Sequence, residues 1–404
     1  MKFHQSMLLS ITVASLAACG GGGGSSSSSN SSSTPASTTA TGYFRDSSVS
    51  GLAYTSGSLS GVTDANGAFT YVIGQPVTFS VGAVSLGTIN TGKALVTPLD
   101  LEGGNTASVT DTAVLNRVRF LMMLDSDNDP SNGIQISPAV QQAAKAWNAL
   151  SINFASSSFT VNPTYISSVN TADGRSNAAL PSTAAATSHF QQTMYCAYSG
   201  GFMGSTSGTD TNGKAFSVPM GFMVDASGTV TGLVGNPYGG ADFYLNATIT
   251  PGSVPVSGSG TIADAYGIDL TTPISISIAA QPDSWSGQSV NSAVHASFTA
   301  SRIGGSPTAK YRYTGFYTGN DKGLFTFDID ASNNVTGSAY SVDDQQSFTL
   351  SGTLSNGSLT VHTSNGATVT ATVDTSSGQI SNATWVGSGA NNKGTFTGSG
   401  CELN

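Results

Sequence analysis

Charged side chains are scarce in this chain of 404 residues, at 9% of all positions. Only 13 residues are Lys or Arg, against 22 Asp or Glu, and the formal net charge is −9. A chain with so few cations neutralises few phosphates, which argues against nucleic-acid binding. The sequence also lacks an uninterrupted apolar run of about 18 residues, so we expect no membrane-spanning helix.

Strong helix formers are rare as well, and glutamate occurs only as Glu102 and Glu402. Glycine is frequent, with 49 residues, and Ser, Thr and β-branched residues are abundant. This composition predicts a mainly β fold with many short strands. We expect a small β-sandwich, a short helical segment and a duplicated, antiparallel β-barrel-like C-terminal domain.

Residues 1–19 have the pattern of a short secretory signal, with Lys2, a mostly apolar run and small residues before Cys19. The segment Leu16-Ala17-Ala18-Cys19 resembles the lipobox of bacterial lipoproteins. This resemblance implies that Cys19 carries acyl chains such as palmitate and holds the exported protein on a membrane. Gly20, in place of Asp, favours the outer membrane in such proteins. The alternative is an ordinary secretory signal beside an incidental cysteine.

Residues 20–41 contain almost only Gly, Ser, Thr, Ala, Asn and Pro. Such a segment cannot bury enough apolar surface to fold, so we expect a disordered tether. As a flexible coil it spans roughly 25 Å.

Two cysteines remain after Cys19, namely Cys196 and Cys401. In an exported protein they face an oxidising compartment, so we predict a Cys196–Cys401 disulfide. We expect it to join the first strand of the C-terminal region to the last residues of that region. The alternative is a pair of buried, unpaired thiols.

Residues 42–100 contain short alternating segments separated by turn residues, as in Asp64-Ala65-Asn66-Gly67. The stretch from Gly61 to Tyr71 resembles small β-sandwich modules similar to the carboxypeptidase regulatory domain. That resemblance implies a non-catalytic spacer.

Residues 101–188 differ in pattern. Apolar residues recur at helical spacing from Thr110 to Leu124, and Ser137-Pro138 opens a second helix that we expect to reach about Leu150. We interpret residues 151–188 as loops and a linker.

The segment between the two expected helices resembles an EF-hand calcium loop, with oxygen ligands expected from Asp125, Asp127, Asp129 and Asn132. Two positions depart from that pattern, since Pro130 replaces the usual Gly and Ile136 replaces the bidentate Glu. A Ca²⁺ site and a solvated turn that bonds its own backbone therefore both stay open.

Residues 189–404 contain an internal repeat, over about 195–303 and 311–401. Four landmarks recur in the same order, among them Trp285-Ser286-Gly287 and Trp385-Val386-Gly387. So many strands must protect their edges, which favours closure into a barrel. The Gly-aromatic pattern is similar to the β-barrel domains of surface lipoproteins such as transferrin-binding protein B. Whether the repeats form one closed barrel or two β units stays open.

Residues suited to catalysis are few. The mature chain has three histidines, His189, His295 and His362, and no Gly-x-Ser-x-Gly elbow before a helix. We expect no enzymatic activity. Aromatic residues of the repeats are candidates either for a binding face or for the core: Tyr195, Tyr198, Phe202, Tyr238, Phe243, Tyr244, Tyr311, Tyr313, Phe316, Tyr317 and Tyr340.

These observations predict a lipid-anchored protein of the cell envelope with a non-catalytic binding or adhesion role. Its ligand would be a protein or a glycan that the sequence does not identify. Two alternatives stay open, an envelope enzyme or accessory factor acting on glycans, and a periplasm-facing scaffold.

Overall fold

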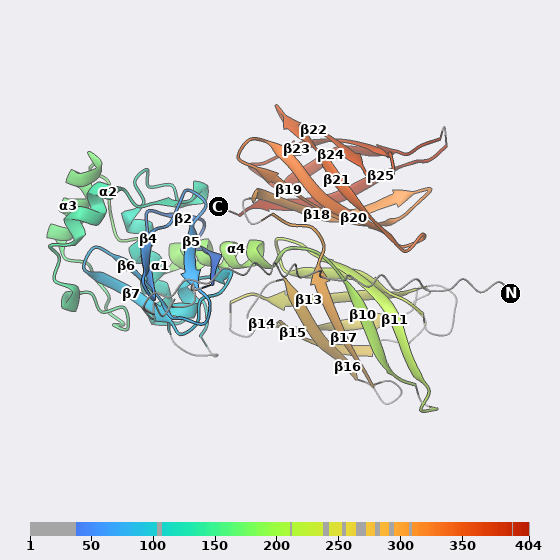
Figure 1. Cartoon of the computed structure of the whole chain (residues 1–404), viewed down its shortest axis with the longest axis horizontal. Coiled ribbons are helices and arrows are strands. Elements are labelled where there is room, and N and C mark those ends of the chain that lie inside the picture. The colour runs from blue at the N-terminus through green and yellow to red at the C-terminus, as the bar shows by residue number, and fades with distance from the viewer. Residues whose placement is uncertain are drawn as a thin grey trace, which may run out of the picture. The chain divides into compact units, whose positions relative to one another are not determined.

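The computed structural model describes residues 38–102, 107–210, 212–236, 242–252, 256–263, 272–278, 283–290, 295–306, 309–389 and 391–403. The predicted signal, Cys19 and most of the predicted tether lie outside the described residues. The mainly β fold is confirmed, with two closed antiparallel barrels and several smaller sheets. Figure 1 shows the elements in chain order from blue to red.

The N-terminal part forms small sheets in the strand orders β5-β1-β8, β4-β3-β6-β7 and β2-β9. Their strands are β1 (Thr39–Phe44), β2 (Val49–Ser50), β3 (Ala53–Ser56), β4 (Leu59–Val62), β5 (Ala68–Val72), β6 (Val77–Val81), β7 (Val84–Ile89), β8 (Leu95–Val96) and β9 (Ile134–Gln135).

The predicted tether is too long at its C-terminal end. Thr39 pairs with Val72 and Thr41 with Thr70, so these residues belong to β1. Threonine has a high strand propensity, and the pairing with β5 outweighs the low-complexity character of the segment. The predicted turn at Asp64 is confirmed, because Asp64 Oδ1 accepts hydrogen bonds from the backbone N–H groups of Asn66 and Ala68.

In the described part of the chain, four α-helices follow: α1 (Thr112–Leu124), α2 (Pro138–Ala144), α3 (Pro163–Asp173) and α4 (Thr183–Tyr198). Three short 3₁₀ turns accompany them: η1 (Pro98–Glu102), η2 (Pro130–Asn132) and η3 (Ala149–Ser151). The first predicted helix is confirmed. The second is shorter than predicted, because α2 ends at Ala144.

The prediction of loops over residues 151–188 is wrong. Asn162 caps α3 through the N–H of Thr164, and Pro163 occupies the first helical position. Ser182 caps α4 through the N–H of Ala185. These caps and the buried Phe190 of α4 outweigh the polar composition of the segment.

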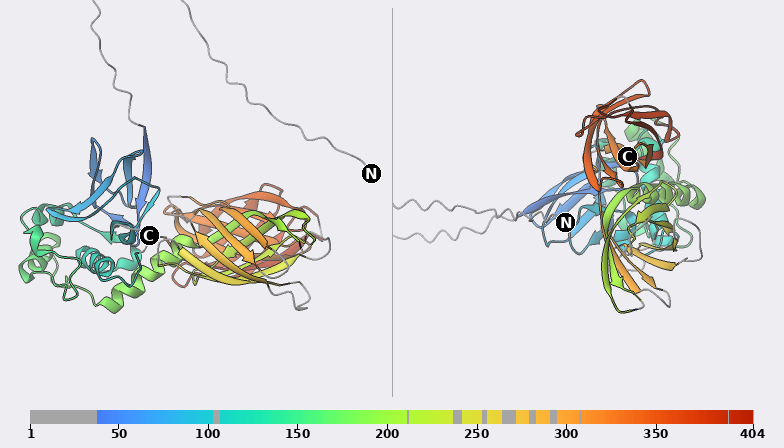
Figure 2. Two further views of the ribbon diagram at one scale, coloured as in Figure 1. Left: turned by 90° about the horizontal axis from the view of Figure 1, so that it is seen from below. Right: turned by 90° about the vertical axis from the view of Figure 1, so that its right-hand side faces the viewer.

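The first barrel consists of β10 to β17 in chain order, and β17 pairs with β10 to close it. Figure 2 shows the tilt of its strands. The strands are β10 (Gly200–Thr209), β11 (Ala215–Val224), β12 (Thr229–Val234), β13 (Phe243–Thr250), β14 (Val256–Ala263), β15 (Thr272–Ile278), β16 (Ser284–Val290) and β17 (His295–Arg302).

The second barrel consists of β18 to β25 and closes through β18 and β25. Each sequence repeat therefore forms a closed barrel of its own. The strands are β18 (Ala309–Gly319), β19 (Gly323–Asp330), β20 (Asn334–Ser341), β21 (Gln346–Ser355), β22 (Ser358–Thr363), β23 (Thr368–Asp374), β24 (Gln379–Val386) and β25 (Lys393–Glu402).

Several glycines of the barrels lie opposite aromatic residues on neighbouring strands. Gly287 pairs with Phe298, and a Cβ at Gly287 would lie 2.1 Å from Phe298 Cε1. In the second barrel Gly400 pairs with Tyr313, and a Cβ at Gly400 would lie 2.4 Å from Tyr313 Cδ1. The missing side chain leaves room for the ring to fold across the neighbouring strand, which explains the Gly-aromatic pattern.

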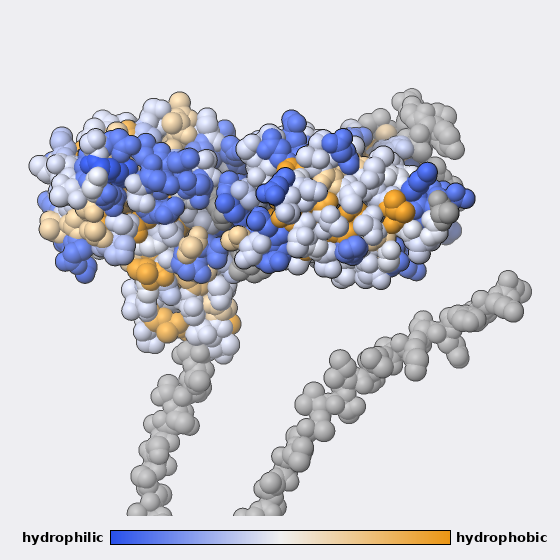
Figure 3. Space-filling model, turned by 90° about the horizontal axis from the view of Figure 1, so that it is seen from above, coloured by the Kyte–Doolittle hydropathy of each residue, from blue (hydrophilic) through white to orange (hydrophobic). Residues whose placement is uncertain are grey.

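Few of the large apolar side chains that the structure describes are exposed. Figure 3 shows hydrophobic residues as separate areas on a mostly polar face. Among the described residues, no helix has the length and apolar character needed to cross a membrane.

Candidate functional site

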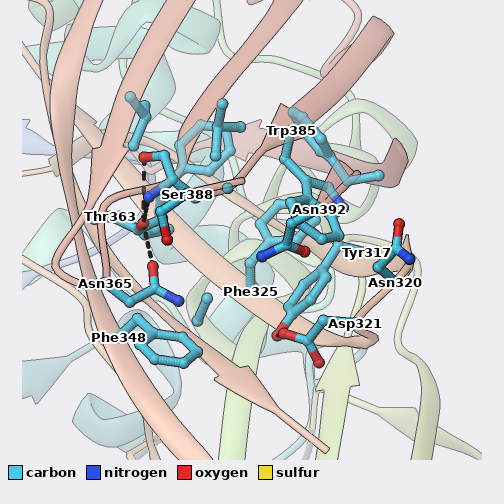
Figure 4. A pocket seen from close by; sticks show the side chains of 18 of the residues that line it. Tyr317, Asn320, Asp321, Phe325, Phe348, Thr363, Asn365, Trp385, Ser388 and Asn392 are labelled. Carbon is cyan, nitrogen blue, oxygen red and sulfur yellow. Dashed lines mark hydrogen bonds between the residues drawn. The ribbon is translucent and has the colours of Figure 1, made fainter. Parts of the chain in front are cut away.

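The lumen of the second barrel contains a cavity of about 230 Å³ (Figure 4). An engineered cavity of about 150 Å³ in another protein holds benzene, so this space accommodates a larger molecule. The lining residues come from the strands of the second barrel and the loops at one of its ends: Tyr317, Asn320, Asp321, Phe325, Phe327, Ala339, Asp344, Phe348, Leu350, Leu359, Val361, Thr363, Asn365, Ala367, Val369, Trp385, Gly387, Ser388, Asn392 and Phe396.

The wall of the cavity is apolar because of strand alternation. Phe325 and Phe327 lie two residues apart on β19, and Leu359 and Val361 lie two residues apart on β22. Side chains at alternate positions of a strand point to the same face, which here is the lumen. Phe325 and Phe396 pack edge to face with their ring centroids 5.3 Å apart.

The mouth of the cavity is polar. The loops that follow β18, β20, β22 and β24 contribute to its lining, with Asp321, Asp344, Asn365 and Asn392 among the residues. Figure 4 shows Asp321, Asn365 and Asn392. An apolar wall with a few polar groups at one end is the usual composition of a small-molecule site.

Two aromatic residues at the mouth are held in fixed positions. Trp385 Nε1 donates a hydrogen bond to the carbonyl oxygen of Thr318, at 3.1 Å. Tyr317 packs edge to face against Trp385, with ring centroids 6.0 Å apart. The Tyr317 hydroxyl donates to Asp321 Oδ2 at 3.1 Å. Burial, followed by the negative charge of Asp321, raises the pKa of Tyr317, so this hydroxyl stays a neutral donor.

Three aromatic rings pack together in the interior of the first barrel. Phe202, Phe222 and Trp285 form a cluster with centroid distances of 4.7 to 5.2 Å. Trp285 is 1% exposed and belongs to the hydrophobic core. The repeats therefore use the matching tryptophans differently, as a core residue in the first barrel and as a cavity wall in the second.

The structure brings together the two cysteines of the predicted disulfide, with a Cα–Cα distance of 5.9 Å between Cys196 and Cys401. The expected position of Cys196 in a first strand is wrong, because Cys196 lies in the last turn of α4. The buried residues Ala186, Phe190, Met194 and Tyr198 recur every four positions, so the helical period continues past the cysteine. The bond thus joins a helix to β25 rather than the two ends of one barrel.

The predicted calcium ligands lie in the loop after α1. Asp127 accepts hydrogen bonds from the Asp129 N–H and the Asn132 amide, and Asp129 accepts from Ser131. Asp125 is fully buried, and burial raises its pKa to about 7. Within the described part of the chain, no group of three or more His, Cys, Asp or Glu side chains is placed to hold a metal ion. Calcium binding here stays a prediction.

None of His189, His295 and His362 lines the cavity. His189 on α4 lies 3.3 Å, Nε2 to Oδ1, from Asp46, while His295 and His362 are exposed on strands. Among the aromatic candidates Tyr317 lines the cavity, Tyr313 is buried in the core of the second barrel, and Tyr238 lies outside the described residues.

Sequence reasoning missed most of the cavity. The sequence pattern identifies Trp385 only as a landmark of the repeat and predicts no site role for Asp321, Asp344 or Phe348. A signal was present, since Asn and Asp residues gather in the loops after alternate strands of the second repeat. In an up-and-down barrel, alternate loops share one end.

No protein-family model matches the chain, and no curated protein matches it. Five solved chains match, among them a protein of unknown function from the DUF3598 family of Nostoc punctiforme. That protein is 8% identical, the match covers 52% of this chain and 97% of that chain, and the TM-score is 0.15.

Proposed function

We propose that this protein is a lipid-anchored envelope protein whose second barrel binds a small apolar molecule. The observation that carries the proposal is the cavity of about 230 Å³ in the lumen of that barrel. Barrels of about eight strands are just wide enough to hold one small ligand. The apolar wall formed by Phe325, Phe327 and Leu359 suits an aromatic or aliphatic ligand better than a glycan.

The size of the cavity sets the scale of the ligand. It exceeds the benzene-binding cavity of about 150 Å³ by roughly half, which corresponds to one or two fused rings. We therefore choose 1-naphthalenemethanol, a neutral two-ring alcohol, as the probe.

Calorimetric titration of this probe into the purified protein tests the proposal. We expect saturable binding to one site, which Ala339→Phe abolishes because Ala339 lines the cavity and the new ring fills it. Thr370→Phe is the matched control, since it adds the same ring to an exposed position of β23. Absence of saturable binding at millimolar probe, or unchanged binding by Ala339→Phe, contradicts the proposal.

The anchor is supported by the lipobox-like segment before Cys19. Two or three acyl chains suffice for stable attachment to a bilayer. We expect wild-type protein in the membrane fraction, labelled by radioactive palmitate, and Cys19→Ala in the soluble fraction without label. Retention of Cys19→Ala on the membrane contradicts lipid anchoring.

Protease treatment of intact cells, probed for residues 191–404, then determines the exposed side of the envelope. Loss of this region supports a role outside the cell, such as adhesion or capture. Full protection supports a periplasm-facing role.

A further inference from the structure

The mouth of the second barrel carries negative charge. Asp321 and Asp344 both line the cavity, and none of its described lining residues is Lys, Arg or His. The neighbouring Lys322 lies 3.4 Å from Asp343, and both of these side chains are about half exposed. Lys322, which follows Asp321 in the sequence, therefore pairs with a carboxylate that does not line the cavity.

Ser341 links the Asp321 carboxylate to the backbone of Asp344. Its hydroxyl donates to Asp321 Oδ1 at 2.7 Å and accepts the backbone N–H of Asp344 at 2.9 Å. The Tyr317 hydroxyl donates to the other oxygen of Asp321. These bonds fix the Asp321 carboxylate beside the ring of Tyr317 (Figure 4) and hold the backbone of Asp344 beside Ser341.

Aromatic rings complete the mouth. Tyr317, Trp385 and Phe348 line the same cavity, and Trp385 is anchored through its bond to Thr318. Aromatic faces attract cations, most strongly where water is partly excluded. The Asp321 carboxylate and the aromatic ring of Tyr317 beside it are thus two groups that both favour a positive charge.

We propose that the ligand of the second barrel is a small aromatic amine, with its ring in the lumen and its ammonium group at Asp321 and Asp344. The inference rests on the proposed function, because it requires that the lumen binds a small molecule. Charge complementarity at the mouth selects the amine, and the apolar wall selects the ring.

Three probes of one ring system test the charge: 1-naphthylmethylamine, 1-naphthalenemethanol and 1-naphthoate. We expect the amine to bind about tenfold more tightly than the alcohol, because a hydrogen bond to a charged group adds this much affinity. We expect the carboxylate to bind more weakly than the alcohol. The affinity for the amine alone falls as ionic strength rises.

Two charge-neutralising variants locate the effect. Asp321→Asn and Asp344→Asn lose most of the preference for the amine over the alcohol and keep the affinity for the alcohol. Asp343→Asn is the matched control, since it removes the same charge beside Asp344 from a side chain that does not line the cavity. It keeps the preference.

The outcomes separate this inference from the proposed function. Equal binding of amine and alcohol, or an unchanged preference in both cavity variants, overturns the amine assignment and leaves lumen binding intact. If none of the three probes binds, both proposals fail. If Asp321→Asn disturbs the fold through Ser341, the result for Asp344→Asn and the salt dependence of the wild type decide.

Discussion

Trp385 donates a hydrogen bond to the carbonyl oxygen of Thr318, at 3.1 Å, and so forms a fixed wall of the cavity in the second barrel. The corresponding residue of the first repeat, Trp285, packs 4.7 Å from Phe202 between ring centroids. The two copies of one sequence pattern thus use the tryptophan for separate tasks, in an aromatic cluster of the first barrel and in the cavity wall of the second.

Alanine substitution of the two tryptophans should separate these tasks. Trp285→Ala leaves a void in a closed core, and we expect a loss of about 3–5 kcal/mol in the free energy of unfolding. Trp385→Ala faces an existing cavity, so we expect a loss of only about 1–2 kcal/mol. Urea denaturation measures both losses. Titration with 1-naphthalenemethanol should show weakened binding for Trp385→Ala alone, and equal binding losses contradict the division of tasks.

The disulfide between Cys196 and Cys401 should contribute strongly to stability. It closes a loop with a sequence separation of 205 residues, and the chain-entropy model gives about 5 kcal/mol for such a loop, as an upper figure. We expect Cys196→Ser, Cys401→Ser and the double variant to lose similar amounts of unfolding free energy, because either change removes the same bond. Reaction of both thiols with maleimide in the unreduced, denatured wild type would falsify the pairing.

Stability should depend on pH through His189. Burial lowers the pKa of His189, but the hydrogen bond to Asp46 and the charges of Asp46 and Asp125 outweigh burial, so the pKa is raised. Protonated His189 therefore stabilises the fold fully below its unfolded value of about 6.5, and this contribution is lost as pH rises through the folded value.

The melting temperature, measured between about pH 5 and pH 9, tests this prediction, because this range includes the unfolded pKa of His. We expect the wild type to lose stability as pH rises, and His189→Gln to lose less. His362→Gln, at an exposed histidine of β22, should keep the wild-type profile. A wild-type profile in His189→Gln contradicts the prediction.

Calcium binding at the loop after α1 remains to be tested. A calcium ion there has to compete with the hydrogen bonds that Asp127 makes to Asn132 and that Asp129 makes to Ser131. We therefore expect an affinity no tighter than the weak extracellular range of about 10⁻⁴–10⁻³ M. Calorimetry and thermal shift at millimolar Ca²⁺ check this, with Asp127→Asn as the control. No heat and no shift in the wild type exclude the site.

Local signals predicted much of the fold. Composition and the repeat predicted a mainly β chain with a duplicated barrel-like region, and the helix at Thr112–Leu124 followed from its apolar period. The helices α3 and α4 were missed because their polar composition masked the caps at Asn162 and Ser182. Polar sequences of this kind become helical when a few residues such as Phe190 reach a core.

The sequence predicts the cavity less well than it predicts the fold. Alternation identifies the residues of a strand that point inward, but the size of the lumen depends on how rings from several strands pack. Phe202, Phe222 and Trp285 meet in the first barrel through pairings distant in sequence. In the second barrel, the position of Trp385 depends on its hydrogen bond to Thr318, which lies 67 positions away in the sequence.

The bond between Cys196 and Cys401 encloses every strand of both barrels within one covalent ring. A protease that cuts one loop of either barrel thus opens the ring without releasing a fragment. On a non-reducing gel the nicked chain keeps its full mass, and reduction is needed to separate the pieces. A lipid-anchored copy nicked in this way would stay whole at the membrane for as long as its surroundings remain oxidising.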